Sequence, residues 1–291
     1  MKQLVILSGK GGTGKTTVAG AFIRLAQDKA FADCDVDAPN LHLVMNDLHQ
    51  IAENEFYALK KAVKYEEACV HCGKCEQNCR FGAITNGTVN IHHCEGCGVC
   101  EYFCTAASLT GIAAIRLEDN VSGHTYVSKV NEETFSHAQL KIGNGASGKL
   151  VTEVRKRLYS QMKDEKLVII DGSPGIGCPV IASVTGTDAV LVVTEPSLSG
   201  LHDLKRIVQV ARRFETPCAV CINKYDVNIE VAEQIEQYCH DEKILFAGRI
   251  PYDSAVIEAV NCNKSIIEYH LSPAAQAVNE LWTEIKEWLD K

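Results

Sequence analysis

Residues 9–16 read G-K-G-G-T-G-K-T and match the pattern G-x-x-x-x-G-K-[ST] without a mismatch. They follow an apolar segment, residues 4–8, and lead into a segment with helical periodicity, residues 16–27. Glycines let such a loop curl until its N–H groups converge on phosphate oxygens, and the helix N-terminus adds partial positive charge. The start of the chain therefore predicts a strand, loop and helix that together bind the phosphates of a nucleotide.

Apolar segments of strand length alternate with helical segments through most of the remaining sequence. The expected strands are 30–33, 167–171, 188–194, 218–223 and 243–248, and the expected helices are 148–161, 201–214, 229–240, 254–262 and 273–290. Fully apolar strands that alternate with helices are typical of a parallel sheet covered on both faces. We therefore predict an α/β fold of the P-loop NTPase class with a mostly parallel sheet.

Individual residues of the loop have separate predicted roles. Lys15 is expected to pair with the β- and γ-phosphates, and the hydroxyl of Thr16 is expected to reach Mg²⁺. The predicted phosphate-binding residues are Gly9, Lys10, Gly11, Gly12, Thr13, Gly14, Lys15, Thr16 and Thr17.

Eight of the fourteen cysteines lie between positions 69 and 104, in two runs with the same spacing, C-x2-C-x2-C-x3-C. In bacterial ferredoxins with this spacing, the fourth cysteine of each run ligates the cluster of the other run. Zinc is the competing metal, but its sites usually show two C-x2-C pairs separated by a longer gap. We therefore predict two [4Fe–4S] clusters, the first held by Cys69, Cys72, Cys75 and Cys104 and the second by Cys94, Cys97, Cys100 and Cys79.

The cysteine runs interrupt the α/β pattern, which predicts an inserted module. We expect a first part of the nucleotide-binding domain at 1–60, a two-cluster ferredoxin-like α+β insertion at 61–110, and the second part of the domain at 111–291. The net charge of −8 disfavours non-specific nucleic-acid binding, which depends on Lys and Arg contacts to phosphate. No segment approaches the ~20 apolar residues of a membrane helix, so we expect no membrane insertion and a cytoplasmic location.

Lys10 adds a second lysine to the phosphate loop, and this loop resembles the deviant Walker A loop of the MinD/ParA/Mrp superfamily of P-loop ATPases. In that family the early lysine reaches across a dimer to the nucleotide of the partner. The resemblance implies an ATP-sandwiched homodimer and a catalytic role for Lys10 beside Lys15. On spacing alone, a solvated loop lysine is the safer interpretation of Lys10.

Two acidic segments extend this resemblance. Residues 33–40, D-C-D-V-D-A-P-N, look like the first switch of the family, which implies that Asp37 orients the attacking water and that Asp35 lies nearer the metal. Residues 171–175, D-G-S-P-G, look like Walker B and the second switch, which implies that Asp171 holds Mg²⁺. Asp171 also ends a predicted central strand, where ligands bind in open parallel sheets.

A third pair of segments resembles the base-binding elements of the family. Residues 223–226 read N-K-Y-D, which implies that Asn223 contacts the base, and residues 249–253 resemble the loop that closes over it, which includes Pro251. The resemblance favours adenine, and hence ATP. The N-K-x-D motif alone also fits guanine recognition.

Taken together, the motifs resemble a MinD-superfamily ATPase with an inserted ferredoxin domain. We expect ATP hydrolysis, slow and stimulated by a partner, that couples nucleotide state to electron transfer or to metallocluster assembly and delivery on a redox or metalloprotein client. The alternative is a MinD-like positioning or scaffolding ATPase whose clusters are structural or sense redox state. Between Asp37 and Cys69 the spacing predicts a loop and a helix.

Overall fold

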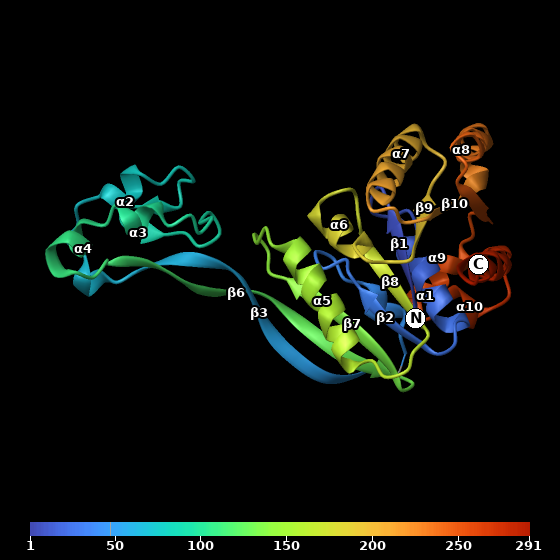
Figure 1. Ribbon diagram of the computed structural model, residues 1–291, viewed down its shortest axis with the longest axis horizontal. Helices are drawn as coiled ribbons and strands as arrows, with labels where there is room; N and C mark the ends of the chain where they lie inside the picture. The colour runs from blue at the N-terminus through green and yellow to red at the C-terminus, as the bar shows by residue number, and fades with distance from the viewer. Residues whose placement is uncertain (47) are drawn as a thin grey trace. The chain divides into compact units, whose positions relative to one another are not determined.

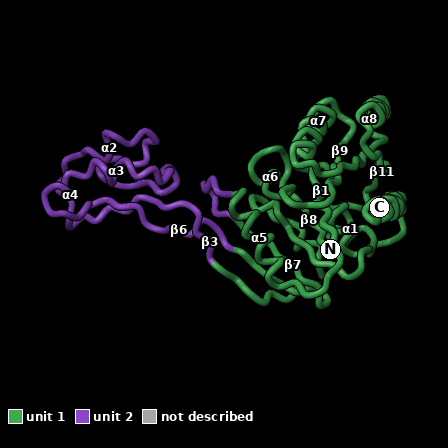
Figure 2. The backbone as a smooth tube through the Cα atoms, in the orientation of Figure 1, with its two compact units in different colours: residues 1–54, 125–139, 147–291 green, residues 55–124, 140–146 purple. Residues whose placement is uncertain are grey.

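The computed structural model describes residues 1–46 and 48–291, and its chain divides into two compact units. Unit 1 comprises residues 1–54, 125–139 and 147–291, and unit 2 comprises residues 55–124 and 140–146 (Figure 2). The expected insertion, 61–110, falls within unit 2. Two of the four unit boundaries lie inside long strands, β3 (Leu48–Lys64) and β6 (Ile115–Val130), so each of these strands carries the chain from one unit into the other.

Among the described residues, nine strands form one sheet in the order β11-β10-β9-β1-β8-β2-β7-β6-β3. Its central strands pair in parallel, with β1 between β8 and β9 (Figure 1). The bounds of these strands are β1 Lys2–Ser8, β2 Lys29–Asp33, β7 Glu133–Leu140, β8 Leu167–Pro174, β9 Ala189–Thr194, β10 Cys218–Asn223 and β11 Leu245–Ile250. The predicted α/β fold with a mostly parallel sheet is confirmed.

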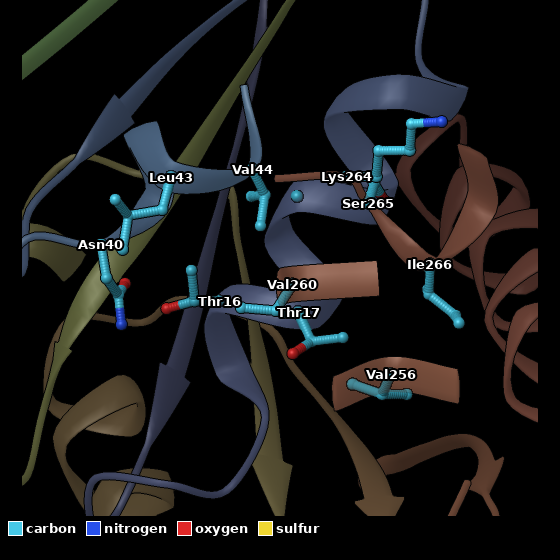
Figure 3. Close-up of a pocket in the computed structure, with 11 residues that line it drawn as sticks. Thr16, Thr17, Asn40, Leu43, Val44, Val256, Val260, Lys264, Ser265 and Ile266 are labelled. Carbon is cyan, nitrogen blue, oxygen red and sulfur yellow. The ribbon is translucent and has the colours of Figure 1, made fainter. Parts of the chain in front are cut away.

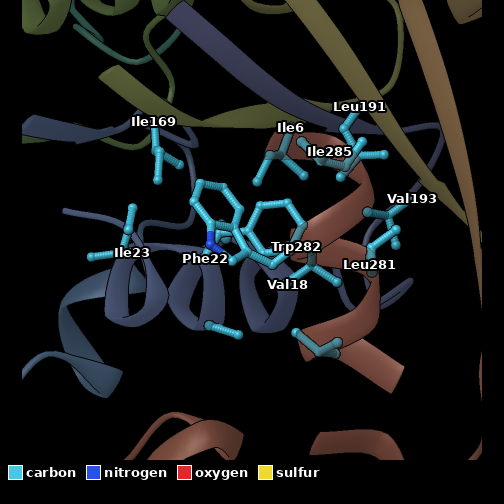
Figure 4. Packing of buried hydrophobic residues seen from close by; sticks show 14 of the residues in the cluster. Ile6, Val18, Phe22, Ile23, Ile169, Leu191, Val193, Leu281, Trp282 and Ile285 are labelled. Carbon is cyan, nitrogen blue, oxygen red and sulfur yellow. The ribbon is translucent and has the colours of Figure 1, made fainter. Parts of the chain in front are cut away.

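The helices of unit 1 bury apolar stripes against this sheet. Their bounds are α1 Lys15–Leu25, α5 Ser147–Gln161, α6 Cys178–Val184, α7 Leu198–Arg213, α8 Ile229–Asp241, α9 Ala255–Asn261, α10 Ile266–Tyr269 and α11 Pro273–Leu289. Figure 4 shows Phe22 of α1 and Trp282 of α11 packed below Ile6 of β1, with the two ring centroids 4.9 Å apart. The helix that begins at the phosphate loop is therefore fixed by the main core.

The segment between Asp37 and Cys69 differs from the prediction of a loop and a helix. It contains a short 3-10 helix, η1 (Leu41–Val44), and then the 17-residue strand β3. Strand β3 lies at the edge of the sheet beside β6, and Thr125 Oγ1 donates a 3.3 Å hydrogen bond to the Asn54 carbonyl. The helical prediction was wrong because pairing with a distant strand overrides local propensity.

Candidate functional site

The phosphate loop joins β1 to α1 and bends at two glycines in the left-handed region, Gly12 (φ 81°) and Gly14 (φ 91°). A side chain at Gly14 would place its Cβ 2.2 Å from the amide nitrogen of Asn223. The left-handed backbone and the close neighbour both require glycine at this position. The motif therefore forms the tight loop that its glycines predict.

A cavity of about 510 Å³ opens above this loop. It brings the loop together with both acidic segments that the sequence singles out, because Asp35 and Asp37 of one segment and Ser173 and Pro174 of the other all line it. The loop contributes Gly11, Gly12, Thr13, Gly14, Lys15, Thr16 and Thr17 to the lining. Backbone N–H groups, one lysine and two carboxylates thus surround a space large enough for a phosphate chain and its metal.

Asp171 is fully buried in β8, three residues before that strand ends at Pro174. One carboxylate oxygen lies 2.5 Å from Lys15 Nζ, and the other accepts a 2.7 Å hydrogen bond from the Thr16 hydroxyl. Burial acts to lower the pKa of Lys15, but the carboxylates of Asp171 and Asp33 outweigh it, and the pKa is raised. Lys15 is therefore held as a cation at the floor of the cavity.

Asp33 is a residue that sequence reasoning did not select as part of the site. Its buried carboxylate accepts 3.0 Å hydrogen bonds from the backbone N–H groups of Asp35, Asn40 and Leu41. Burial, and then repulsion by Asp171, raise the pKa of Asp33 to about 7. Asp33 thus shapes the loop that carries Asp35 and Asp37. In the sequence, its position at the end of the predicted strand 30–33 was the feature that could have identified it as a site residue.

Lys10 points to the side of the loop, where its ammonium lies 2.6 Å from Glu195 Oε1 of the same chain. The other oxygen of Glu195 lies 3.8 Å from Lys224 Nζ, which also donates a 3.2 Å hydrogen bond to the Gly12 carbonyl. Glu195 and Lys224 were not predicted as site residues. Together they fix Lys10 and the loop backbone in one arrangement.

The N-K-Y-D segment follows β10 and contacts the loop directly. The Asn223 amide donates a 2.8 Å hydrogen bond to the Thr13 carbonyl, so the structure places this side chain against the loop backbone. Asp226 accepts a 2.8 Å hydrogen bond from the N–H of Tyr252, next to Pro251. The motif therefore ties the phosphate loop to the segment predicted to cover the base.

A smaller apolar cavity of about 140 Å³ adjoins the first, and the two share Thr16, Thr17 and Asn40 (Figure 3). Side chains of Val256 and Val260 from α9 line it. Its remaining lining consists of Gly20, Leu43, Val44, Lys264, Ser265 and Ile266. An apolar chamber thus lies beside the polar phosphate cavity.

Unit 2 contains two pockets lined by cysteines. The first is lined by Cys69, Cys72, Cys75 and Cys104, and the second by Cys79, Cys94, Cys97 and Cys100. Each pocket thus combines three cysteines of one run with the fourth cysteine of the other. Within the described residues, no group of three or more His, Cys, Asp or Glu side chains is arranged to hold a metal ion.

The two cysteine loops repeat the same backbone conformation. The residue before the second cysteine has positive φ in both, at His71 (52°) and Gly96 (64°), and so does the residue after it, at Gly73 (71°) and Gly98 (76°). Gly73 and Gly98 immediately precede the short helices α2 (Lys74–Gln77) and α3 (Val99–Tyr102). Two equivalent loops thus wrap around two pockets.

Several backbone N–H groups point at cysteine sulfurs. Those of His71, Ala62, Ala83 and Ala114 donate to the Sγ atoms of Cys69, Cys94, Cys79 and Cys104, respectively, over 3.2–3.4 Å. Such bonds stabilise thiolates and tune the potential of a cluster. Four cysteines and sulfur-directed N–H donors are the kinds of groups that a [4Fe–4S] cluster requires, so the chemistry of each pocket fits such a cluster.

A phosphate loop between β1 and α1, with a buried carboxylate at the end of the adjacent strand β8, defines an α/β P-loop nucleotide-binding protein. The chain belongs to the family of CobQ/CobB/MinD/ParA nucleotide-binding domains, whose model matches residues 4–266. Within the part of the chain described, no helix is long and apolar enough to cross a membrane.

Several relatives match nearly the whole chain. An uncharacterized protein of Methanocaldococcus jannaschii is 30% identical, covering 99% of this chain and 97% of its own. An iron-sulfur cluster carrier protein of Pyrococcus abyssi is 31% identical, covering 96% of this chain and 83% of its own. Among solved structures, the septum site-determining protein MinD of Pyrococcus horikoshii with Mg-ADP has a TM-score of 0.58 at 17% identity, covering 99% of this chain and 96% of that chain. The membership in the MinD/ParA/Mrp superfamily expected from the sequence is confirmed.

Proposed function

We propose that this protein is an ATPase that carries two [4Fe–4S] clusters and couples its nucleotide state to electron transfer or to metallocluster delivery on a client protein. One observation carries the proposal: a single chain holds both a phosphate cavity floored by Lys15 and Asp171 and two four-cysteine pockets. A ferredoxin alone needs no phosphate loop, and an ATPase alone needs no paired cysteine runs.

In this proposal, the residues of the cavity have different roles in ATP hydrolysis. Lys15 and the loop N–H groups bind and neutralise the phosphates, while Thr16, Asp35 and Asp171 would hold Mg²⁺. Asp37 lines the cavity wall and orients the attacking water. Asn223 and Pro251 remain the proposed contacts of the base. Lys10 reaches the nucleotide of a second copy in an ATP-sandwiched homodimer.

The cysteine pockets would each hold one cluster, which supplies one-electron chemistry when bound. The protein holds the cluster through four thiolates and directs N–H groups at the sulfurs, and Cys72 and Cys97 are the exposed ligands. An exposed ligand at each pocket gives a client a short route to the cluster.

Coupling is supported by the order of the parts along the chain. Strand β3 begins four residues after η1, which follows the loop of Asp35 and Asp37, and β3 leads into the first cysteine run. We propose that the nucleotide-dependent position of this loop changes the cysteine module through β3. The name of the Pyrococcus abyssi relative favours cluster delivery, whereas complete four-cysteine ligand sets favour clusters that stay.

Reconstitution under anaerobic conditions tests the proposal. We expect two clusters by iron and sulfide analysis, loss of cluster signal in Cys72→Ser and Cys97→Ser, and no loss in Cys262→Ser, which changes an exposed cysteine outside the runs. Amide hydrogen exchange of residues 61–110 should respond to ATP in the wild type and not in Lys15→Ala. Transfer of clusters to an apo-ferredoxin in the presence of ATP would select delivery over electron transfer. Clusters that form without any response to ATP would favour the scaffolding alternative.

A further inference from the structure

Two neighbouring lysines of β3 lie on opposite faces of the strand. Lys60 exposes 58% of its side chain, whereas Lys61 is only 4% exposed. The ammonium of Lys61 donates a 2.5 Å hydrogen bond to the backbone carbonyl of Cys94, and the N–H of the next residue, Ala62, donates to the Cys94 sulfur. A buried cation is thus fixed against the loop that lines the second cysteine pocket.

No carboxylate of the described residues lies within ion-pair distance of Lys61. The first pocket differs, because its lining lysine, Lys64, is paired with Glu66 at 2.7 Å. Glu95 lines the second pocket but is exposed, so water screens its charge. The two pockets therefore have similar sulfur ligands and different nearby charge.

This difference has a direct electrostatic consequence. Reduction adds one negative charge to a cluster that already carries four thiolates, and a buried pocket opposes that added charge. Cys94 and Cys100 are buried at 7% and 8% exposure, so the opposition is strong at the second pocket. A fixed positive charge acts in the other direction, and burial makes its effect larger than that of a surface charge.

We propose that Lys61 is a positioning residue that raises the reduction potential of the second cluster, offsetting the effect of that cluster's burial. The inference rests on the proposed function, since it requires the clusters to be present. The electron would come from a one-electron donor such as dithionite, which is oxidised as the cluster is reduced. The second cluster would thereby accept an electron at a higher potential than its burial alone would give.

Redox titration of the intact, reconstituted protein, followed by electron paramagnetic resonance, tests the inference. In Lys61→Met we expect the reduction potential of one of the two clusters to fall by at least about 59 mV. For a one-electron couple, this shift is a tenfold change in the ratio of reduced to oxidised cluster. Lys61→Arg, which keeps the charge, should restore the wild-type value. Lys60→Met, on the opposite face of the same strand, should leave both steps in place.

Iron and sulfide content separates the possible failures. Wild-type protein that forms no clusters would refute the proposed function itself. Full clusters with an unchanged potential in Lys61→Met would overturn only the inference about Lys61. If Lys61→Met loses iron, Lys61→Gln keeps a donor for the Cys94 carbonyl without the charge. A lower potential in Lys61→Gln would support the inference, and loss of the second cluster there too would make Lys61 a structural residue and overturn it.

Discussion

The ammonium of Lys10 and the carboxylate of Glu195 form an ion pair of 2.6 Å within one chain. A lysine that reaches the nucleotide of a partner must first leave this carboxylate. In the proposed ATP-sandwiched dimer, Glu195 would therefore compete with the nucleotide of the partner for Lys10, and breaking this pair would add to the free-energy cost of dimerisation.

Glu195→Gln should strengthen ATP-dependent dimerisation. Partly exposed ion pairs contribute about 0.2–1 kcal/mol each, so releasing two per dimer should lower the dissociation constant by roughly two- to thirtyfold. Sedimentation velocity with ATP measures the change. Glu242→Gln removes a surface pair with Arg212 and serves as the matched control. Weaker dimerisation of Glu195→Gln would show that Glu195 supports the interface rather than opposing it.

Asp171→Asn should reduce ATP hydrolysis by about 10²-fold or more. The change removes the charge that holds Lys15 and weakens the acceptor of the Thr16 hydroxyl, and in the proposed mechanism these two groups position the phosphates and Mg²⁺. Phosphate release under saturating ATP gives the rate. Asp188→Asn is the control, since Asp188 bonds the backbone of Gln3 at the opposite end of β1. Unimpaired hydrolysis in Asp171→Asn would remove Asp171 from the proposed mechanism.

Gly96→Ala should abolish the second cluster and spare the first. A Cβ at Gly96 would lie 2.2 Å from the backbone carbonyl oxygen of Lys60, which cannot move without distorting β3. Gly82 has a similar φ of 60° but open space around it, so Gly82→Ala tests backbone strain without the clash. Iron and sulfide content per chain distinguishes the two variants. Equal iron loss in both would attribute the effect to backbone conformation alone.

The stability of the protein should fall as the pH drops from about 6.5 to 4. His137 is packed between the rings of Phe135 and Tyr126, and burial, with a smaller effect of nearby His42, lowers its pKa to about 4. The unfolded chain therefore binds a proton at a higher pH than the folded chain, and protons favour unfolding across this window. The stabilising contribution of neutral, buried His137 is fully present only at pH values above the pKa that this histidine has in the unfolded chain.

His137→Phe keeps the ring stack and removes the titration, so it should flatten this part of the pH dependence. Urea unfolding between pH 4 and pH 7 measures the effect. His240→Gln changes an exposed histidine and should leave the slope as in the wild type. A slope that His137→Phe does not change would assign the acid sensitivity to other groups.

The central sheet and the phosphate loop could be predicted because their signals are local. The motif of residues 9–16 fixes β1 and α1, and the apolar runs fix β8, β9 and β10 within a few residues. Strand β3 could not be predicted, because much of its sequence is exposed and polar and its conformation depends on pairing with β6, which begins 51 residues after β3 ends. Pairing over such distances leaves no local pattern.

The site residues likewise fall into those that the sequence identifies and those that only the structure identifies. Lys15 and the cysteines belong to motifs with fixed spacing, so sequence alone selects them. Glu195 and Lys61 act through contacts with residues distant in the sequence, and no motif marks them. Asp33 lies in a segment that the sequence singles out, but its bonds to backbone N–H groups of the following loop are visible only in the structure. Such supporting residues emerge only when the fold brings the segments together.

The rate of ATP hydrolysis by the reconstituted protein, measured anaerobically with the clusters oxidised and then reduced by dithionite, tests the central claim most directly. The electron paramagnetic resonance signal of the clusters is recorded with and without ATP in the same samples. We predict that the hydrolysis rate changes with cluster oxidation state and that ATP alters the cluster signal. Hydrolysis that is the same in both oxidation states, together with a signal that ATP leaves unchanged, would contradict the coupling of the two sites.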